Sequence, residues 1–384
     1  MQRKQTIYLT LLILTSFIGV SQTAENNDYR ELVWEENWDF LDHDNWWVLD
    51  SSSHPVSDVV VHMASEVNID NGELVLTAKY QPSYCGETLL TPVWGGLGPC
   101  NRPQPTNYEY IAGRVMSKEP LNALYGFIEA RIKTTDTPGT FPAFWTYIGG
   151  VNPEATDEEI DIFELLPGKN LSCEESEFHK ITHNKNILTS NLHGGRLPFC
   201  DGAAEVCDDC TGYFKMVGID DYTKYHTYGL EWSPNRIIWY IDSVPVRVEK
   251  FRIPIKQSII FNQGIQENNP PASTSFHAEM RVDWVRYYSL KEGYKETLNP
   301  KLYQSYPNPF SQDSEIIAEI PEGVNKAVLM FFNVQGQVTK TIEILERGTI
   351  KTTIKGCDFS PGIYIYALFI DGKEVGSKKM VSIY

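Results

Sequence analysis

The stretch that decides the fold lies near the middle of the chain and reads Glu159-Ile160-Asp161-Ile162-Phe163-Glu164. Acidic and large apolar side chains alternate in it, which is the period-two pattern of a β-strand with one polar face and one core face. Strict alternation would turn Glu164 toward the core, where an unpaired carboxylate is costly. One extra residue at Ile162-Phe163, a β-bulge, would return Glu164 to the face of Glu159 and Asp161. The stretch therefore predicts a bulged strand with three carboxylates on one face.

Three neighbouring acids on one strand suit the hydrolysis of glycosidic bonds. A separation of roughly 5 Å between the outer two carboxylates is typical of a retaining glycosidase, in which one acts as nucleophile and the other as acid/base. Crowding also forces the pKa values of such acids apart, so that one stays protonated as a general acid. An acidic surface strand or a calcium site is the alternative, because short acidic motifs recur by chance.

The residues on either side of this stretch also have strand patterns. Short alternating runs cover residues 73–78, 126–132 and 236–242, and Gly, Pro and Asn turns separate them. We find no long stretch of helical period and no internal repeat. The sequence therefore predicts an all-β fold, an antiparallel sandwich or barrel.

Composition narrows the class of partner. The formal net charge is −17, which argues against nucleic acid because phosphate binding needs a basic surface. The chain has 21 Tyr and 9 Trp, which suit a β-rich fold and equally suit the apolar faces of sugar rings. A neutral polysaccharide fits this balance best, and we expect a monomer.

The chain begins with a predicted signal peptide, residues 1–21. Arg3 and Lys4 precede an apolar run from Ile7 to Val20, too short for a membrane span. Export makes disulfides the expected state of the cysteines, with Cys85 and Cys100 as the most natural pair. Cys200, Cys207 and Cys210 also suggest zinc, but a second ligand pair is missing, and the other pairings stay open.

The organisation changes near residues 289–305, which are polar, lack periodicity and are predicted to be a linker. More strand-like runs follow. From Asn299 onward nine Lys and Arg balance nine Asp and Glu, so the whole net negative charge belongs to the part before it. We therefore expect a catalytic domain at residues 28–288 and a second domain at residues 306–384.

The first of these domains resembles glycoside hydrolase family 16, in the laminarinase-like form with a bulged active-site motif. Besides residues 159–164, the resemblance rests on segments in the expected order across roughly residues 30–288. They are residues 32–38, 71–78, 112–118, 125–133, 141–145, 226–232 and 280–286.

The resemblance implies a concanavalin-like β-jelly-roll whose concave face forms a glycan cleft. Glu159 would be the nucleophile, Glu164 the acid/base and Asp161 the residue that holds the nucleophile's geometry. Trp145 and its neighbour Phe144 would bind substrate. We expect His193 to lie on the adjacent strand and to hydrogen-bond the acids, and we expect Trp232 and Trp239 to be core residues. Asp283 matches a position that in many members helps to bind a structural calcium; the chemistry itself would need no cofactor.

The last 80 or so residues are similar to the C-terminal sorting domain of the type IX secretion system of certain Gram-negative bacteria. The residues that carry this likeness are 302–310, 333–337, 360–366, 371–373 and 378–381. The likeness implies a small β-sandwich, the type IX machinery as a partner, and a secreted or cell-surface enzyme. A carbohydrate-binding module is the alternative, but this region has no Trp.

The sequence thus predicts a secreted endo-acting hydrolase of β-1,3- or mixed β-1,3/1,4-glucan, such as laminarin. Two alternatives stay open. One is a hydrolase of red-algal galactans of the agarose, porphyran or carrageenan type. The other is a non-catalytic glycan-binding surface protein, although such a protein would need aromatic residues rather than three acids.

Overall fold

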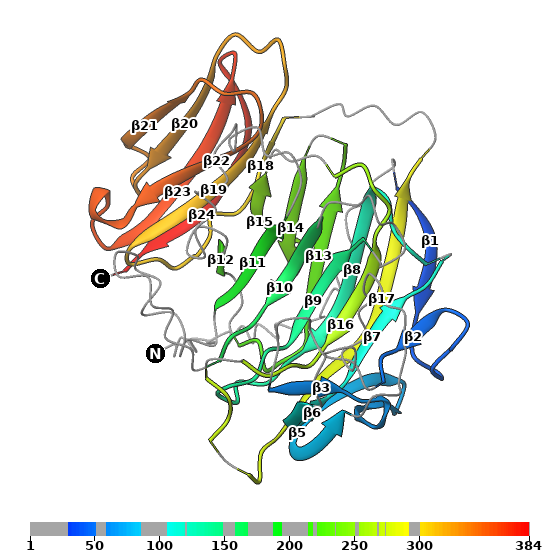
Figure 1. Ribbon diagram of the computed structural model, residues 1–384. Helices are drawn as coiled ribbons and strands as arrows, with labels where there is room; N and C mark the ends of the chain where they lie inside the picture. The colour runs from blue at the N-terminus through cyan, green and yellow to red at the C-terminus, as the bar shows by residue number, and fades with distance from the viewer. Residues whose placement is uncertain are drawn as a thin grey trace, which may run out of the picture.

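The structure is a computed structural model of the chain (Figure 1). It describes residues 30–50, 59–85, 106–119, 121–148, 158–167, 187–193, 214–217, 221–234, 236–249, 253–266, 269–272, 274–291 and 300–383. The predicted signal peptide and Cys100, Cys200, Cys207 and Cys210 lie outside these residues, so the expected disulfides do as well. No helix within the described ranges is both long and apolar enough to cross a membrane.

The larger of the two main sheets has ten strands and packs against the sheet that holds the acidic strand. Its central order is β15-β14-β13-β8-β17-β5-β6-β3, with β1 paired to β17 and β4 to β5. All pairings are antiparallel except β3 with β6. The strands are β1 (Arg30–Glu36), β3 (Val60–His62), β4 (Val67–Asp70), β5 (Glu73–Cys85), β6 (Thr106–Ala112), β8 (Gly126–Lys133), β13 (His226–Trp232), β14 (Ile237–Ile241), β15 (Val244–Glu249) and β17 (His277–Leu290).

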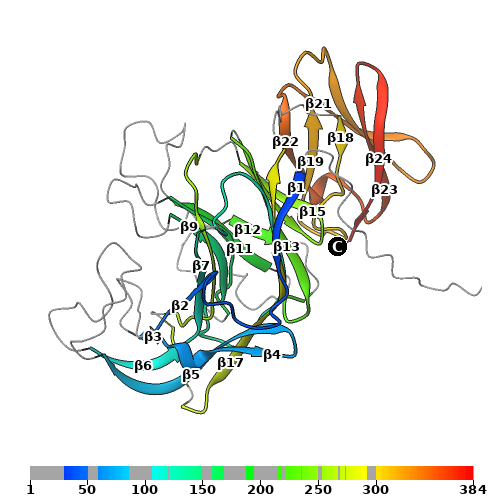
Figure 2. The ribbon, with the colours of Figure 1, turned by 90° about the vertical axis from the view of Figure 1, so that its right-hand side faces the viewer.

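The second main sheet has seven strands in the order β12-β11-β10-β9-β16-β7-β2. The acidic strand β10 lies in it, between β9 and β11. The strands are β2 (Trp46–Val48), β7 (Arg114–Ser117), β9 (Ala143–Tyr147), β10 (Glu159–Glu164), β11 (Ile187–His193), β12 (Phe214–Val217) and β16 (Ser258–Asn262). Figure 2 shows the two sheets from the side.

One hydrophobic core fills the space between these sheets. The seven-stranded sheet contributes Ile160, Phe163 and Phe261, and the ten-stranded sheet contributes Trp239 and Val282, all fully buried. Strand β10 alternates inward apolar residues with outward acids, as the sequence pattern predicted. This arrangement confirms the predicted jelly-roll sandwich.

The C-terminal part is the predicted small β-sandwich, with its own core around Phe310, Phe331 and Tyr366. One sheet holds β18 (Lys301–Leu302), β19 (Asp313–Ile320) and β22 (Gly348–Lys355). The other holds β21 (Val338–Ile344), β20 (Ala327–Phe332), β23 (Gly362–Ile370) and β24 (Lys373–Ser382). The expected hairpin turn at residues 333–337 joins β20 to β21, where the Asn333 side chain accepts hydrogen bonds from the backbone N–H groups of Gln335 and Gln337.

The predicted linker is shorter than its sequence suggested. Strand β17 runs on to Leu290, where it pairs with Arg30 of β1, and β18 begins at Lys301. Ser289 and Leu290 are only partly buried at the end of β17, and such strand ends have the composition of a linker, which explains the difference.

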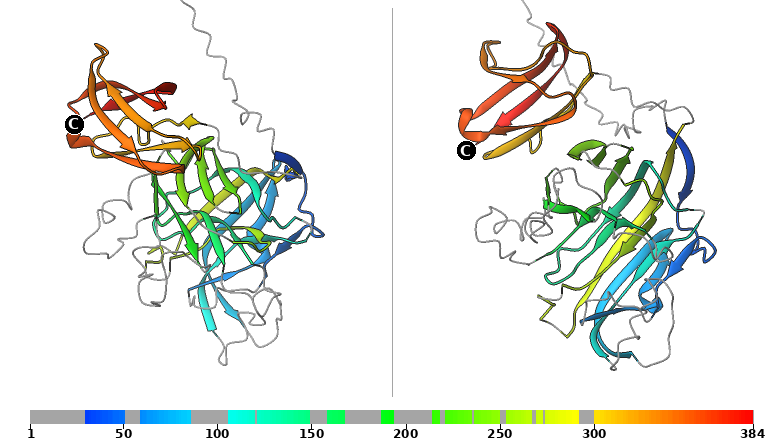
Figure 3. Two further views of the ribbon diagram at one scale, coloured as in Figure 1. Left: turned by 90° about the horizontal axis from the view of Figure 1, so that it is seen from above. Right: turned by 45° about the horizontal axis from the view of Figure 1, so that its top comes forward.

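The C-terminal domain contacts the edge of the ten-stranded sheet, where β15 lies next to β22 (Figures 1 and 3). Arg236 donates a hydrogen bond to the Thr349 hydroxyl, and Tyr306 packs against the core of the larger domain. Arg236 also donates to Glu231 at 3.0 Å, so a buried ion pair lies at this contact.

Candidate active site

The acidic strand β10 has the predicted bulge. On the side of β9, Asp161 is opposite Trp145 but the next paired residue is Phe163, opposite Phe144. On the side of β11 the pairing jumps from Asp161 to Glu164. Ile162 is therefore the extra residue, and both it and Ile160 are buried in the core. The bulge returns Glu164 to the face of Glu159 and Asp161, as the sequence predicted.

Each acid of this trio, Glu159, Asp161 and Glu164, belongs to a different row of side chains across the seven-stranded sheet. Residues directly opposite each other on paired strands share a face. Glu159 is opposite Tyr147 and His193, Asp161 is opposite Trp145 and Asn191, and Glu164 is opposite Ala143 and Thr189. Asp161 and Glu164 are 1% and 7% exposed, whereas Glu159 is half-buried. The trio thus forms a compact acidic group on the face of the sheet that points away from the core.

Burial and like charge make Glu159 hold a proton more tightly than an ordinary glutamate. Its pKa is raised well above the usual value, first by desolvation and then by the charges of Asp161 and Glu164 and a hydrogen bond with Asp161. Arg114 opposes this shift, because its cation favours the ionised carboxylate. A carboxyl group whose pKa is raised by neighbouring acids is the kind of arrangement that acid/base chemistry on a glycosidic oxygen requires.

Arg114 of β7 is a buried cation on this face, and the sequence reasoning did not single it out. It is 3% exposed, its guanidinium lies 4.8 Å from the ring centroid of Trp145, and burial lowers its pKa to about 10. The preceding Gly113 lets β7 approach the backbone of Glu66, since a Cβ there would lie 2.3 Å from the Glu66 carbonyl oxygen. The Ala-Gly-Arg segment that places this cation lies in the family resemblance, so its signal was available.

Trp145 lies on the same face as the trio and is held firmly. Its indole Nε1 donates to Asn262 Oδ1 at 2.7 Å, and it packs with Leu49, Met116 and Ile260. Only 6% of its surface is exposed. Its position opposite Asp161 agrees with a ring that lines the site, and substrate contact by Trp145 stays a prediction.

Of the other two predicted substrate-binding residues, Phe144 was wrongly assigned. Phe144 is fully buried between the sheets, where it stacks on Phe261 with ring centroids 4.6 Å apart. Neighbouring residues in a strand point to opposite faces, so Phe144 and Trp145 cannot both line the cleft. His193 ends β11 opposite Glu159, as expected from the sequence, but its side chain lies outside what the structure describes.

A second set of residues contacts the acidic strand from the core side of its sheet. Trp239 of β14 donates from its Nε1 to the Asp161 carbonyl oxygen at 2.9 Å. The guanidinium of Arg247 lies 4.3 Å from the Trp239 ring centroid and donates to Ser190 Oγ of β11 at 2.9 Å. Trp239 was expected in the core, which is confirmed, but its contact with Asp161 was not foreseen.

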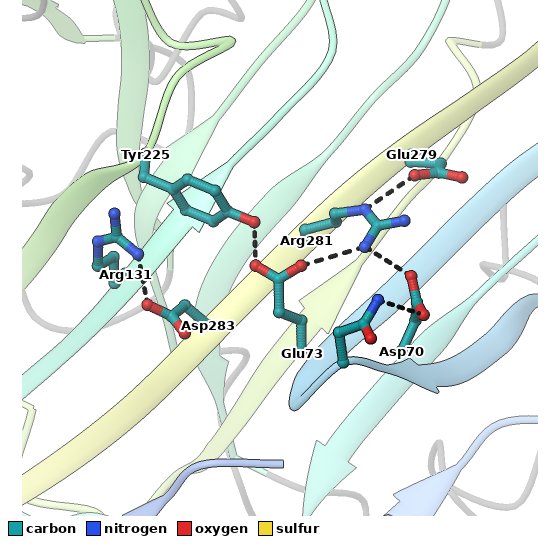
Figure 4. A network of polar contacts seen from close by, with 8 residues as sticks. Asp70, Glu73, Arg131, Tyr225, Glu279, Arg281 and Asp283 are labelled. Carbon is teal, nitrogen blue, oxygen red and sulfur yellow. Dashed lines mark hydrogen bonds and ion pairs between the residues drawn. The ribbon is translucent and has the colours of Figure 1, made fainter. Parts of the chain in front are cut away.

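The proposed calcium ligand Asp283 lies on the ten-stranded sheet, within a network of charged side chains (Figure 4). Its carboxylate forms an ion pair with Arg131, whose guanidinium lies 4.3 Å from the Tyr225 ring centroid. Arg281 nearby is paired with Asp70, Glu73 and Glu279. Among the described residues no cluster of three or more His, Cys, Asp or Glu could hold a metal ion. Calcium at Asp283 therefore stays a prediction that these side chains do not support.

The three acids on a bulged jelly-roll strand can be compared with known families. Residues 58–284, more than half of the chain, match the sequence model of "Glycosyl hydrolases family 16". The chain belongs to this family. Residues 304–383 match the "Secretion system C-terminal sorting domain". The chain therefore combines a family 16 domain with a type IX sorting domain, and it is exported to the medium or the cell surface.

The relatives within family 16 have names that refer to different polysaccharides. The chain is 28% identical over 262 residues to the kappa-carrageenase of Pseudoalteromonas carrageenovora, covering 63% of this chain but only 60% of that enzyme. It is 24% identical to the beta-glucanase of Rhodothermus marinus, covering 76% of this chain and 96% of that protein. The solved endo-β-1,3-glucanase from Pyrococcus furiosus superposes with a TM-score of 0.52 at 20% identity, covering 69% of this chain and 96% of that one. This likeness shows the jelly-roll fold alone.

Proposed function

We propose that the chain is a retaining, endo-acting glycosidase of a β-linked polysaccharide. The observation that carries the proposal is the bulge in β10, which brings Glu159, Asp161 and Glu164 to one face of the seven-stranded sheet. A strand without the bulge would leave only two acids there. Two carboxylates that flank one bond are the machinery of retaining hydrolysis.

In this mechanism Glu159 attacks the anomeric carbon while Glu164 gives its proton to the leaving glycosidic oxygen. A covalent glycosyl-enzyme forms on Glu159. Glu164, now ionised, takes a proton from the incoming water, which releases the sugar with its original configuration. Asp161 shares a hydrogen bond with Glu159 and so fixes the nucleophile's orientation, whereas Arg114 favours its ionised, attacking form.

Our first candidate substrate is β-1,3- or mixed β-1,3/1,4-glucan such as laminarin. A beta-glucanase that aligns over nearly its full length supports this choice. The second candidate is a red-algal galactan of the agarose, porphyran or carrageenan type. It is favoured by the kappa-carrageenase relative and by buried Arg114, a cation on the acidic face that would suit an anionic sugar.

The test is to incubate the purified chain with laminarin, mixed-linkage glucan, agarose and kappa-carrageenan and to analyse the products. We expect oligosaccharides of mixed length from one of these polymers, and β-anomers as the first products in proton NMR. Glu159→Gln should abolish turnover while leaving polymer binding largely intact. Glu119→Gln, at an exposed glutamate paired with Lys256, is the matched control and should be fully active.

Binding of a polymer without any cleavage would overturn the enzyme assignment and favour a glycan-binding surface protein. An α-anomer as the first product would overturn the retaining mechanism alone.

A further inference from the structure

One row of side chains crosses the seven-stranded sheet from the acidic trio to the sheet's far edge. It starts at Asp161 on β10 and continues through opposite residues on four successive strands. These are Trp145 on β9, Ile260 on β16, Met116 on β7 and Trp47 on β2. Since opposite residues share a face, Trp47 points to the same side of the sheet as the three acids.

Trp47 is the exposed member of this row. Its side chain is 44% exposed, whereas Met116, Ile260 and Trp145 are all buried. Its neighbour along the strand, Trp46, points the other way and is packed in the core, which fits the alternation of a strand. The row is therefore buried from Trp145 to Met116 and ends in one large accessible ring.

Lys118 holds this ring in place. Its Nζ lies 3.8 Å from the Trp47 ring centroid and donates to the His43 carbonyl oxygen at 2.6 Å. The ammonium group lies over the indole, and 44% of the Trp47 side chain is still exposed. An accessible aromatic ring in a fixed position is chemically suited to a sugar ring, whose C–H face stacks on the indole.

We propose that Trp47, positioned by Lys118, forms a distal subsite that binds the polysaccharide chain several sugar rings from the bond that is cleaved. Four strand spacings of about 4.8 Å place this subsite about 19 Å from β10 along the row. This inference rests on the proposed glycosidase function. It adds that chain-length preference is set at the β2 edge of the sheet, by a contact that only long substrates reach.

A remote contact of this kind acts on binding and not on the chemical step. Short oligosaccharides that fill only the sites near Glu159 should be cleaved with the same kcat/KM whether or not Trp47 is present. Long chains should gain from it, and the gain should appear in KM.

The experiment compares Trp47→Ala with the native full-length chain. The substrates are whichever of laminarin, mixed-linkage glucan, agarose or kappa-carrageenan the native chain cleaves, together with oligosaccharides of increasing length prepared from that polymer. We expect KM for the polymer to rise about 3- to 10-fold, the size of a typical aromatic contact, with kcat unchanged. The kcat/KM for the shortest cleaved oligosaccharide should not change.

Trp284→Ala is the matched control, because Trp284 lies on β17 of the ten-stranded sheet under the guanidinium of Arg286, 4.2 Å from the ring centroid. It removes an equivalent tryptophan–cation pair from the other sheet and should leave both kinetic constants unchanged. Trp47→Tyr, which keeps an aromatic ring, should recover most of the affinity and covers the case in which the alanine variant folds poorly.

An unchanged KM for polymer in Trp47→Ala, or an equal loss on short and long substrates, would overturn the distal subsite while leaving the glycosidase proposal in place. Failure of the native chain to cleave any of the glycans would overturn both.

Discussion

The indole Nε1 of Trp239 donates a hydrogen bond of 2.9 Å to the backbone carbonyl oxygen of Asp161. Asp161 is the last residue before the bulge, where the regular ladder of β10 with its neighbours is interrupted. A bulge leaves backbone groups without ladder partners, and a buried carbonyl without a donor is costly. Trp239, from the opposite sheet, supplies that donor and ties the middle acid to the core.

Trp239→Phe should therefore lower both stability and rate. We expect a loss of about 1–3 kcal/mol in the free energy of unfolding from the unsatisfied carbonyl, and a lower kcat because the bulge sets the spacing of the acids. The matched control is Trp232→Phe. Trp232 is equally buried on β13, and its Nε1 has no hydrogen-bond partner within the described residues. It should cost stability through packing alone and leave kcat unchanged. Urea unfolding measures the stability of both variants. Equal effects of the two variants on kcat would contradict the role of Trp239 in holding Asp161 at the bulge.

Asp161→Asn should shift the acidic limb of the pH–rate profile to lower pH. The charge of Asp161 and its hydrogen bond both raise the pKa of Glu159. Without them that pKa falls, so the ionised nucleophile persists to lower pH. We also expect a strong loss in kcat, about 10- to 100-fold, with little change in melting temperature. The profile of kcat/KM against pH measures the shift, because it reports the free enzyme. Full activity combined with a much lower melting temperature would make Asp161 a purely structural residue.

Arg114→Met should move the same limb in the opposite direction. The Arg114 cation lowers the pKa of Glu159, so removing it raises that pKa further and the nucleophile ionises only at higher pH. Arg114→Lys keeps the charge and should leave the limb close to its native position. A limb that stays in place in both variants would show that Arg114 acts on substrate rather than on the nucleophile.

Glu159→Gln should stabilise the fold at neutral pH while it abolishes turnover. The folded-state pKa of Glu159 is raised, so its contribution to stability is complete below the usual glutamate value of 4.5 and is lost as the pH rises through the raised pKa. Glutamine carries no such penalty. The melting temperature of Glu159→Gln should exceed that of the native chain at neutral pH, and the two should converge below pH 4.5. Glu119→Gln, at an exposed residue, should show no such gain.

Most of what could be predicted about the fold and the site came from the period-two alternation of polar and apolar residues. It required the bulge at Ile162, because Glu164 would otherwise have pointed into the core, and the structure has that bulge. The same rule, applied to residues 143–147, would have excluded Phe144 from the cleft once Trp145 was placed there. Contacts between strands that are distant in the sequence produce no periodic pattern of residues. The hydrogen bond from Trp239 to Asp161 joins residues 78 positions apart, and no residue spacing in the sequence predicts it.

The C-terminal domain should be dispensable for catalysis but not for export. A chain that ends at Leu290 keeps every strand of the two main sheets, so it should fold and cleave soluble glycan as well as the full chain does. It loses the packing of Tyr306 against the catalytic core and the bond from Arg236 to Thr349, and it should melt a few degrees lower for that reason. Tyr306→Ala in the full-length chain should reproduce part of this loss and serves as the control. In the native host, deletion of residues 306–384 should leave active enzyme in the periplasm, because the sorting domain directs passage across the outer membrane. A large rise in KM for insoluble glucan on truncation would instead identify a binding module, and undiminished export would contradict the sorting role.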